Sequence, residues 1–186
     1  MAETTAPRAS GYTADALSPA EPAIERQRPI FILNAALLFA CASMYFGTGG
    51  SLVLFSFPLA PQLTPANYFL PFVAPVEAAT RFFTYMTIVM VASAIVMAWS
   101  EWRTGYRWIP LAVLGAVIAA TALTIYGIFP YNKEMEAHIG DAARLHVVLD
   151  RWMLLNKIRV SLWILQWVLM SAYFVQKAMR APKVRA

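Results

Sequence analysis

The sequence predicts an all-α fold, an integral membrane bundle of four transmembrane helices. Of its 186 residues, 60% are hydrophobic and 13% are charged, whereas a soluble domain usually carries about 25% charged residues. Four apolar runs reach the roughly 20 residues that an α-helix needs to cross a bilayer. The basic residues gather at the ends of these runs. The formal net charge of +5 therefore indicates lipid headgroups as partners and no nucleic acid.

The apolar runs divide the chain into one helical domain between two polar tails. Residues 1–28 are rich in Ala, Pro, Glu and Thr, have little to bury, and are expected to be disordered. The predicted spans, in chain order, are residues 29–57, 76–99, 108–129 and 145–178. A basic tail follows at residues 179–186.

The three connections between these spans differ in kind. The first contains PLAPQLTPANYFLPFVAP, in which five prolines within 18 residues forbid a regular helix; we expect it to lie on the membrane surface or to fold over the bundle. The second, SEWRTGYRW, is short and basic. The third, YNKEMEAHIGDAARLH, is charged, and we expect helical character around Gly140.

The distribution of Lys and Arg predicts the orientation. Nine of the fifteen lie in the two tails, at the end of the fourth span and in the second connection, and the first connection has none. Because Lys and Arg are enriched on the cytoplasmic side, we expect both termini in the cytoplasm and the protein in a bacterial inner (plasma) membrane. The nine are Arg8, Arg26, Arg28, Arg103, Arg107, Lys177, Arg180, Lys183 and Arg185.

Small residues recur at helical spacing in two spans and predict close helix contacts. In lipid, small side chains let two helix backbones approach where the hydrophobic effect gives no help. The residues are Ser43, Gly47 and Ser51 in the first span, and Ala112, Ala116, Ala120 and Thr124 in the third. The single cysteine, Cys41, lies inside an apolar run and is interpreted as a buried thiol.

Polar residues open the fourth span, in the stretch DRWMLLNKIRVSLW at 150–163. Trp152, Asn156 and Arg159 are spaced i, i+4 and i+7, so they share one helix face. Counting about 20 residues back from Lys177 places them near the outer edge of the hydrocarbon. A cation just inside that edge still needs a partner.

Polar residues from other spans reach the same depth. Glu77 and Arg81 begin the second span, Asn132 follows the third, and Glu77 is a candidate ion partner for Arg159 or Arg81. We therefore predict a pocket at the outer end of the bundle, with the first connection as its lid. The alternative is that these charged side chains only anchor the helix ends. The candidate catalytic residues are Asn156, Arg159, Asn132 and Glu77, and the candidate substrate-binding residues are Trp152, Arg81, Tyr68 and Phe72.

A metal site is a further alternative. Glu134, His138 and Asp141 have helical spacing, and His146 and Asp150 are four residues apart. Histidines with carboxylates can bind a transition metal, although such residues are ordinary in a solvated loop. We expect no metal; if one binds, His138, His146 and Asp150 are the candidates.

The segments FPYNKEMEAH and DRWMLLNKIRVSLW resemble the pattern of the anthrone oxygenase-like membrane proteins. That family shows Pro-x-Asn after the third span, and then a Trp, a polar residue and an Arg that open the fourth. The glycine-bearing first span and the Pro-rich first connection are also similar, so the resemblance covers most of residues 30–176. It implies a small four-helix membrane protein that oxidises anthrone-type polyketides to anthraquinones with molecular oxygen. It also implies that no metal, haem or flavin is needed.

By position, the resemblance implies a site lined by Asn132, Trp152, Asn156 and Arg159. An anthrone is acidic enough to form a stabilised anion that can give an electron to oxygen. On this hypothesis Arg159 stabilises the oxyanion, with the two asparagines as hydrogen-bond donors, and Trp152 stacks on the ring. The base stays open among Glu77, Asp150 and His146.

Three functions stay open at this point. The first is a cofactor-independent membrane oxygenase acting on anthrone-type or other lipophilic aromatic substrates. The second is a non-catalytic subunit or small-molecule-binding component of a larger membrane complex, and the third is a metal- or haem-dependent membrane redox protein. The expected partners are the lipid bilayer, a lipophilic small molecule, and either a second copy of the chain or another membrane protein.

Overall fold

A computed structural model describes residues 29–180, so the predicted tail 1–28 and residues 181–186 of the predicted tail 179–186 lie outside the described residues. The described part contains α-helical, π-helical and 3-10 segments and no strand, which confirms the all-α prediction. Four helical rods are each long and apolar enough to cross a membrane. The rods are Pro29–Gln62, Phe69–Ser100, Trp108–Glu136 and Ala142–Arg180.

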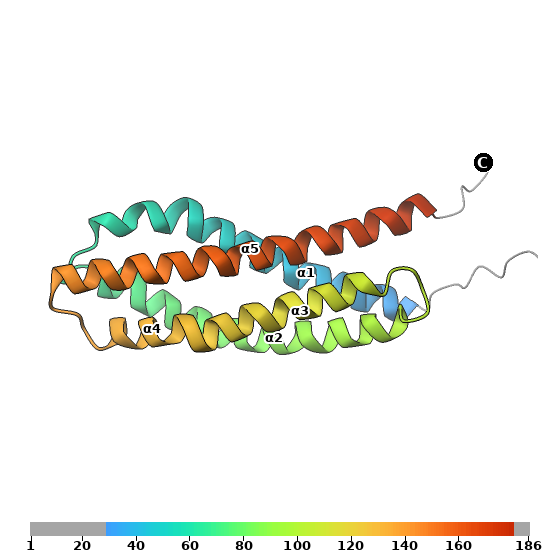
Figure 1. The fold of residues 1–186 in the computed structure, drawn as a ribbon, viewed down its shortest axis with the longest axis horizontal. Helices are drawn as coiled ribbons and strands as arrows, with labels where there is room; N and C mark the ends of the chain where they lie inside the picture. Colours follow the sequence, from blue (N-terminus) through green and yellow to red (C-terminus); the bar gives the residue numbers. More distant parts are fainter. Residues whose placement is uncertain (1–28, 181–186) are drawn as a thin grey trace, which may run out of the picture.

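The rods lie side by side as an elongated bundle (Figure 1). The first contains α1 (Pro29–Ser51), the second α2 (Ala74–Ser100), the third α3 (Trp108–Ala122) and α4 (Phe129–Glu136), and the fourth is α5 (Ala142–Arg180). The start of α1, the α2–α3 turn and the end of α5 share one end of the bundle. The other two connections lie at the opposite end, which we call the connection end.

Three of the rods contain a widened, π-helical turn, and each turn comes just before a proline. The turns are Leu52–Ser56, Phe69–Val73 and Leu123–Ile128, and the prolines are Pro58, Pro75 and Pro130. A proline has no N–H to donate, and its ring clashes with the carbonyl four residues earlier. In each rod that carbonyl lies inside the widened turn, which relieves the clash without ending the helix.

The first connection is more helical than the sequence predicts. After the widened turn, a 3-10 segment runs over Phe57–Gln62, and only residues 63–68 are outside helices. The connection folds over the end of the bundle. The buried Tyr68 donates a hydrogen bond to the carbonyl of Met135 at 2.9 Å and accepts one from the N–H of Ile139 at 2.7 Å. In the third connection the chain leaves the helix around Gly140, where helical character was expected.

The close contact between α1 and α5 is made at a different glycine from the predicted one. A Cβ on Gly49 would lie 2.9 Å from Trp163 and 3.0 Å from Val160, whereas a Cβ on Gly47 meets nothing within 4 Å. Gly49 is buried, and Gly47 and Ser51 are exposed. The small-residue prediction for the first span was therefore wrong about the face of α1 that makes the close contact.

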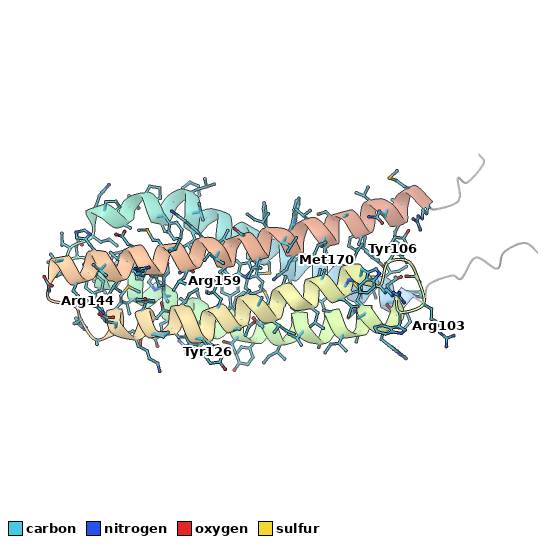
Figure 2. All side chains as sticks on the ribbon, in the orientation of Figure 1. Arg103, Tyr106, Tyr126, Arg144, Arg159 and Met170 are labelled. Carbon is cyan, nitrogen blue, oxygen red and sulfur yellow. The ribbon has the colours of Figure 1, made fainter. Side chains whose placement is uncertain are left out.

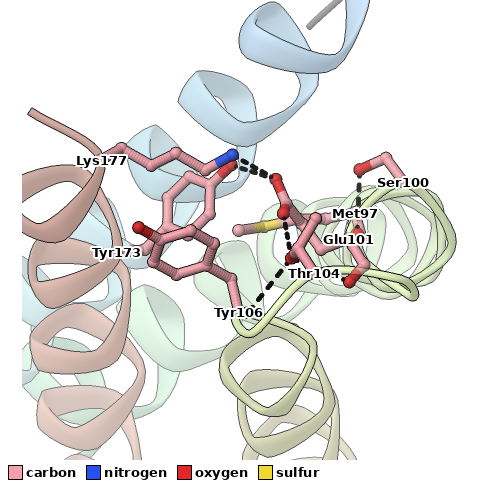
Figure 3. A network of polar contacts seen from close by, with 7 residues as sticks. All are labelled: Met97, Ser100, Glu101, Thr104, Tyr106, Tyr173 and Lys177. Carbon is pink, nitrogen blue, oxygen red and sulfur yellow. Dashed lines mark hydrogen bonds and ion pairs between the residues drawn. The ribbon is translucent and has the colours of Figure 1, made fainter. Parts of the chain in front are cut away.

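A buried carboxylate holds the α2–α3 turn to α5. Glu101 is 0% exposed and follows the last residue of α2. Its Oε1 accepts a hydrogen bond from the Tyr173 hydroxyl at 2.7 Å and pairs with Lys177 Nζ at 2.9 Å. Its Oε2 accepts a hydrogen bond from the Thr104 hydroxyl at 2.6 Å. Figure 3 shows these contacts joining the turn to the end of α5.

Candidate functional site

A cavity of about 590 Å³ lies between the four rods in the half of the bundle nearer the connection end. This volume is within the range of roughly 300–1,000 Å³ that is typical of small-molecule sites. Each rod contributes to its wall, for example Tyr45, Phe83, Thr124, Asn132, Trp152 and Trp163. All three widened turns also border it. Since π-helical turns are rare and are frequently found at functional sites, their convergence marks this cavity as the candidate site.

Arg159 lies in this cavity, near the middle of α5, and its guanidinium faces the interior of the bundle (Figure 2). The guanidinium lies over the Trp163 ring, with Cζ 4.7 Å from the ring centroid. It forms no ion pair with a carboxylate within residues 29–180. Its Nε is buried and has no hydrogen-bond partner in the same residues. A buried cation is costly unless it is paired, so an anion or a strong acceptor bound in the cavity would offset this cost.

A chain of hydrogen bonds fixes the position of Arg159. Trp152 Nε1 donates to Asn132 Oδ1 at 2.8 Å, and Asn156 Nδ2 donates to the Trp152 carbonyl at 2.8 Å. Arg159 then donates from Nη2 to Asn156 Oδ1 and from Nη1 to the Thr124 hydroxyl at 3.3 Å. Asn156 is 0% exposed and does not line the cavity. Its role is therefore to position the Arg159 side chain. The structure therefore brings together Asn132, Trp152, Asn156 and Arg159, the four residues that the resemblance implies for the site.

The cavity wall is apolar and offers few free hydrogen-bond donors. No Asp, Glu or His within residues 29–180 lines it. Six threonines do, and each donates its hydroxyl to the carbonyl four residues earlier in its own helix. They are Thr48, Thr80, Thr84, Thr87, Thr121 and Thr124. Arg159 is therefore the charged group of the wall, and the wall as a whole favours an anionic or electron-rich ligand.

The remaining predicted residues divide between the wall and the outside. Phe72 lines the cavity and packs edge-on against Trp152 at 4.6 Å between ring centroids. Tyr68 is buried outside the wall, where it joins the two connections. Glu77 and Arg81 are exposed, do not line the cavity, and form no ion pair with each other or with Arg159. Neither therefore contacts a ligand in the cavity.

The histidines and their neighbouring carboxylates are separated in the structure. The His138 ring stacks on Phe69 at 3.9 Å between centroids, and Glu134 pairs with Arg144 at 2.5 Å. His146 and Asp150 are exposed. Across residues 29–180, no three His, Cys, Asp or Glu side chains come together in a group that could hold a metal ion.

Gln166 is one of the site residues that the sequence did not predict, as are Trp163 and Thr124. It lines the cavity and is 1% exposed. A signal for it was present, because residues 152, 156, 159, 163 and 166 follow helical spacing along one face of α5. The apolar residues around Gln166 concealed it within the predicted span.

No family model, no curated protein and no solved structure matches this chain.

Proposed function

We propose that this chain is an integral membrane protein that binds a flat, lipophilic aromatic molecule with an acidic oxygen in the cavity, and that it oxidises this molecule with molecular oxygen. One observation carries the proposal: the Arg159 guanidinium lies in an apolar cavity with no carboxylate partner in the described residues. The aromatic wall formed by Phe72, Trp152 and Trp163 suits a planar ring system. The hydrogen-bond chain to Asn132 holds the cation in place before the ligand arrives.

The charge distribution supports a position for the bilayer. On α5, positions 158–176 carry Arg159 as their one charged residue, and on α2 positions 82–100 carry none. Each stretch is about 28 Å long at 1.5 Å per residue, which matches the hydrocarbon thickness of about 30 Å. In this position the connection end projects from the membrane, Arg159 lies just inside the hydrocarbon edge, and a lipophilic ligand enters from the bilayer.

Both ends of the chain are proposed to lie in the cytoplasm. At the end that carries the α2–α3 turn, the described charges are Arg103, Arg107, Lys177 and Arg180 against Glu101. At the connection end, five basic residues are balanced by five acidic ones. These are Arg81, Lys133, Arg144, Arg151 and Lys157, and Glu77, Glu134, Glu136, Asp141 and Asp150. The excess of positive charge at the first end is the cytoplasmic signal.

Cysteine labelling tests this orientation. Gly105 in the α2–α3 turn and Gly140 in the α4–α5 connection are exposed, and a Cβ has open space at both positions. In a Cys41→Ala background, we expect Gly140→Cys to react with a membrane-impermeant maleimide on intact cells and Gly105→Cys to react only after permeabilisation. Labelling of Gly105→Cys on intact cells would reverse the orientation, and equal labelling of both variants would contradict a membrane-spanning bundle.

The proposed reaction oxidises an anthrone-type ring carbon. The substrate loses a proton, and the resulting anion, stabilised by Arg159, gives an electron to oxygen. The ring CH₂ becomes a carbonyl when it loses two hydrogens and gains one oxygen atom. The second oxygen atom leaves with these hydrogens as water. Because Glu77, Asp150 and His146 lie outside the cavity wall, ionisation depends on Arg159 lowering the substrate pKa.

Oxygen uptake by the full chain in liposomes tests this function, with dithranol, a hydroxylated anthrone, as substrate. We expect uptake faster than in protein-free liposomes, with one anthraquinone product formed per oxygen consumed. Binding without added uptake would reject catalysis and leave a small-molecule-binding component of a membrane complex. The absence of both binding and uptake would reject the proposed function.

A further inference from the structure

A second polar group of the cavity wall has an unpaired atom. Gln166 Oε1 is buried and accepts no hydrogen bond from any residue in 29–180. Its residue is 1% exposed and lines the cavity. Buried polar atoms almost always have a partner, and one left without is costly. A buried acceptor of the cavity wall that lacks a partner within the described residues is a candidate contact for a bound ligand.

The neighbouring hydroxyls do not meet this need. The Tyr45 hydroxyl donates to the Phe83 carbonyl at 2.9 Å and lies 2.6 Å from the Thr87 hydroxyl. The lining threonines, Thr87 included, donate within their own helices. Two residues of the wall therefore carry a buried polar atom without a hydrogen-bond partner in residues 29–180: a donor, Arg159 Nε, and an acceptor, Gln166 Oε1.

Helix geometry sets the distance between the backbone positions of Arg159 and Gln166. Gln166 follows Arg159 by seven residues, two turns further along the same face, so the two backbone positions are about 10 Å apart along the helix axis. Trp163 lies between them, with its ring under the Arg159 guanidinium and 4.9 Å from the Tyr45 ring. This wall thus presents a donor, an aromatic surface and an acceptor in a line.

From this arrangement we infer that Gln166 is a specificity-determining residue and that the ligand is a rigid polycyclic aromatic with oxygens at both ends. At one end of the ligand an acidic oxygen accepts a hydrogen bond from Arg159, and at the other end a hydroxyl donates a hydrogen bond to Gln166 Oε1. A linear three-ring molecule with one hydroxyl on each outer ring, at opposite corners, places its two oxygens about as far apart as these two backbone positions. The inference rests on the proposed function and deepens it by naming the substrate class.

A pair of probes and a matched pair of variants test this assignment. The probes are anthraflavic acid, an anthraquinone with hydroxyls at opposite corners of its outer rings, and its analogue that lacks one of them. The variants are Gln166→Leu and the control Gln176→Leu, which makes the same change at an exposed position of the same helix. Binding to the full chain in detergent micelles is measured by titration. The melting temperature of each variant checks its folding, and Gln166→Met replaces Gln166→Leu if that variant does not fold.

The wild-type protein and Gln176→Leu are expected to bind the dihydroxy probe about tenfold more tightly than the monohydroxy probe, as for one buried hydrogen bond. Gln166→Leu is expected to bind both probes with the affinity that the wild-type protein has for the monohydroxy probe. Equal wild-type affinities, or a preference that survives in Gln166→Leu, would overturn the role of Gln166 and leave the proposed function intact. Failure of the wild type to bind either probe would overturn both.

Discussion

Replacing Arg159 by methionine is expected to weaken the binding of a hydroxyanthraquinone anion about 100-fold and to abolish oxidation of the anthrone. The guanidinium is the charged group of the cavity wall and has no carboxylate partner in the described residues. A hydrogen bond to a charged group contributes about 1.5–3 kcal/mol, and its loss removes the interaction that favours the anion. Methionine fills a similar volume with a flexible apolar chain, so the cavity keeps its shape.

The matched control for this variant is Arg151→Met, which makes the same change at an exposed position of the same helix and is expected to bind like the wild type. Arg159→Lys keeps the charge but loses the planar donor fork, and an intermediate affinity is expected. Binding is measured by titration at a pH at which the probe is ionised. Binding of a neutral aromatic of the same size shows whether the cavity of each variant keeps its shape. Unchanged affinity of Arg159→Met for the anion would contradict an anion site at Arg159.

The sequence predicts the part of the site that depends on one helix. Trp152, Asn156 and Arg159 lie on one face because their spacing puts them there in any regular α-helix. Asn132 was placed correctly because it directly follows an apolar run whose end sets its depth. The four rods were predicted for the same reason, since length and apolar content are local properties of the chain.

The rest of the site depends on how the helices are rotated, which an almost uniformly apolar span does not reveal. In a soluble helix the polar face indicates which side is outside, whereas lipid accepts apolar residues on every side. Glu77 therefore could not be distinguished from its neighbour Val76, which lines the cavity. The same ambiguity put the predicted close contact on Gly47 when it is made by Gly49.

Glu101 was missed for a related reason. It lies in a short turn among exposed residues, where an acidic side chain is ordinarily solvated. Its burial comes from Tyr173 and Lys177, which are 72 and 76 positions away in the sequence. No local pattern in SEWRTGYRW indicates this contact, although an acidic residue within a basic turn is compatible with a cation nearby.

Replacing Glu101 by glutamine is expected to lower the free energy of unfolding of the bundle by about 2–4 kcal/mol. The carboxylate is 0% exposed and holds the α2–α3 turn to α5 through Tyr173, Thr104 and Lys177. Breaking a buried ion pair costs about 3–5 kcal/mol when the partner charge stays buried. We expect a loss of stability towards the lower end of this range, because the Lys177 side chain is 28% exposed and can turn towards water.

Thermal unfolding of the detergent-solubilised protein measures this effect, with Glu77→Gln as the matched control. Glu77 lies on the same helix, α2, but is exposed and forms no ion pair in the described residues, so its replacement is expected to change stability by less than about 0.5 kcal/mol. Because Glu101 is remote from the cavity wall, the Glu101→Gln protein that remains folded should bind the anthraquinone probes with wild-type affinity. Equal melting temperatures for the two variants would show that the Glu101–Lys177 pair contributes nothing to the bundle. A loss of ligand affinity without a loss of stability would show that this turn is coupled to the cavity. That result would contradict the expectation, because the contacts of Glu101 are confined to the α2–α3 turn and the end of α5.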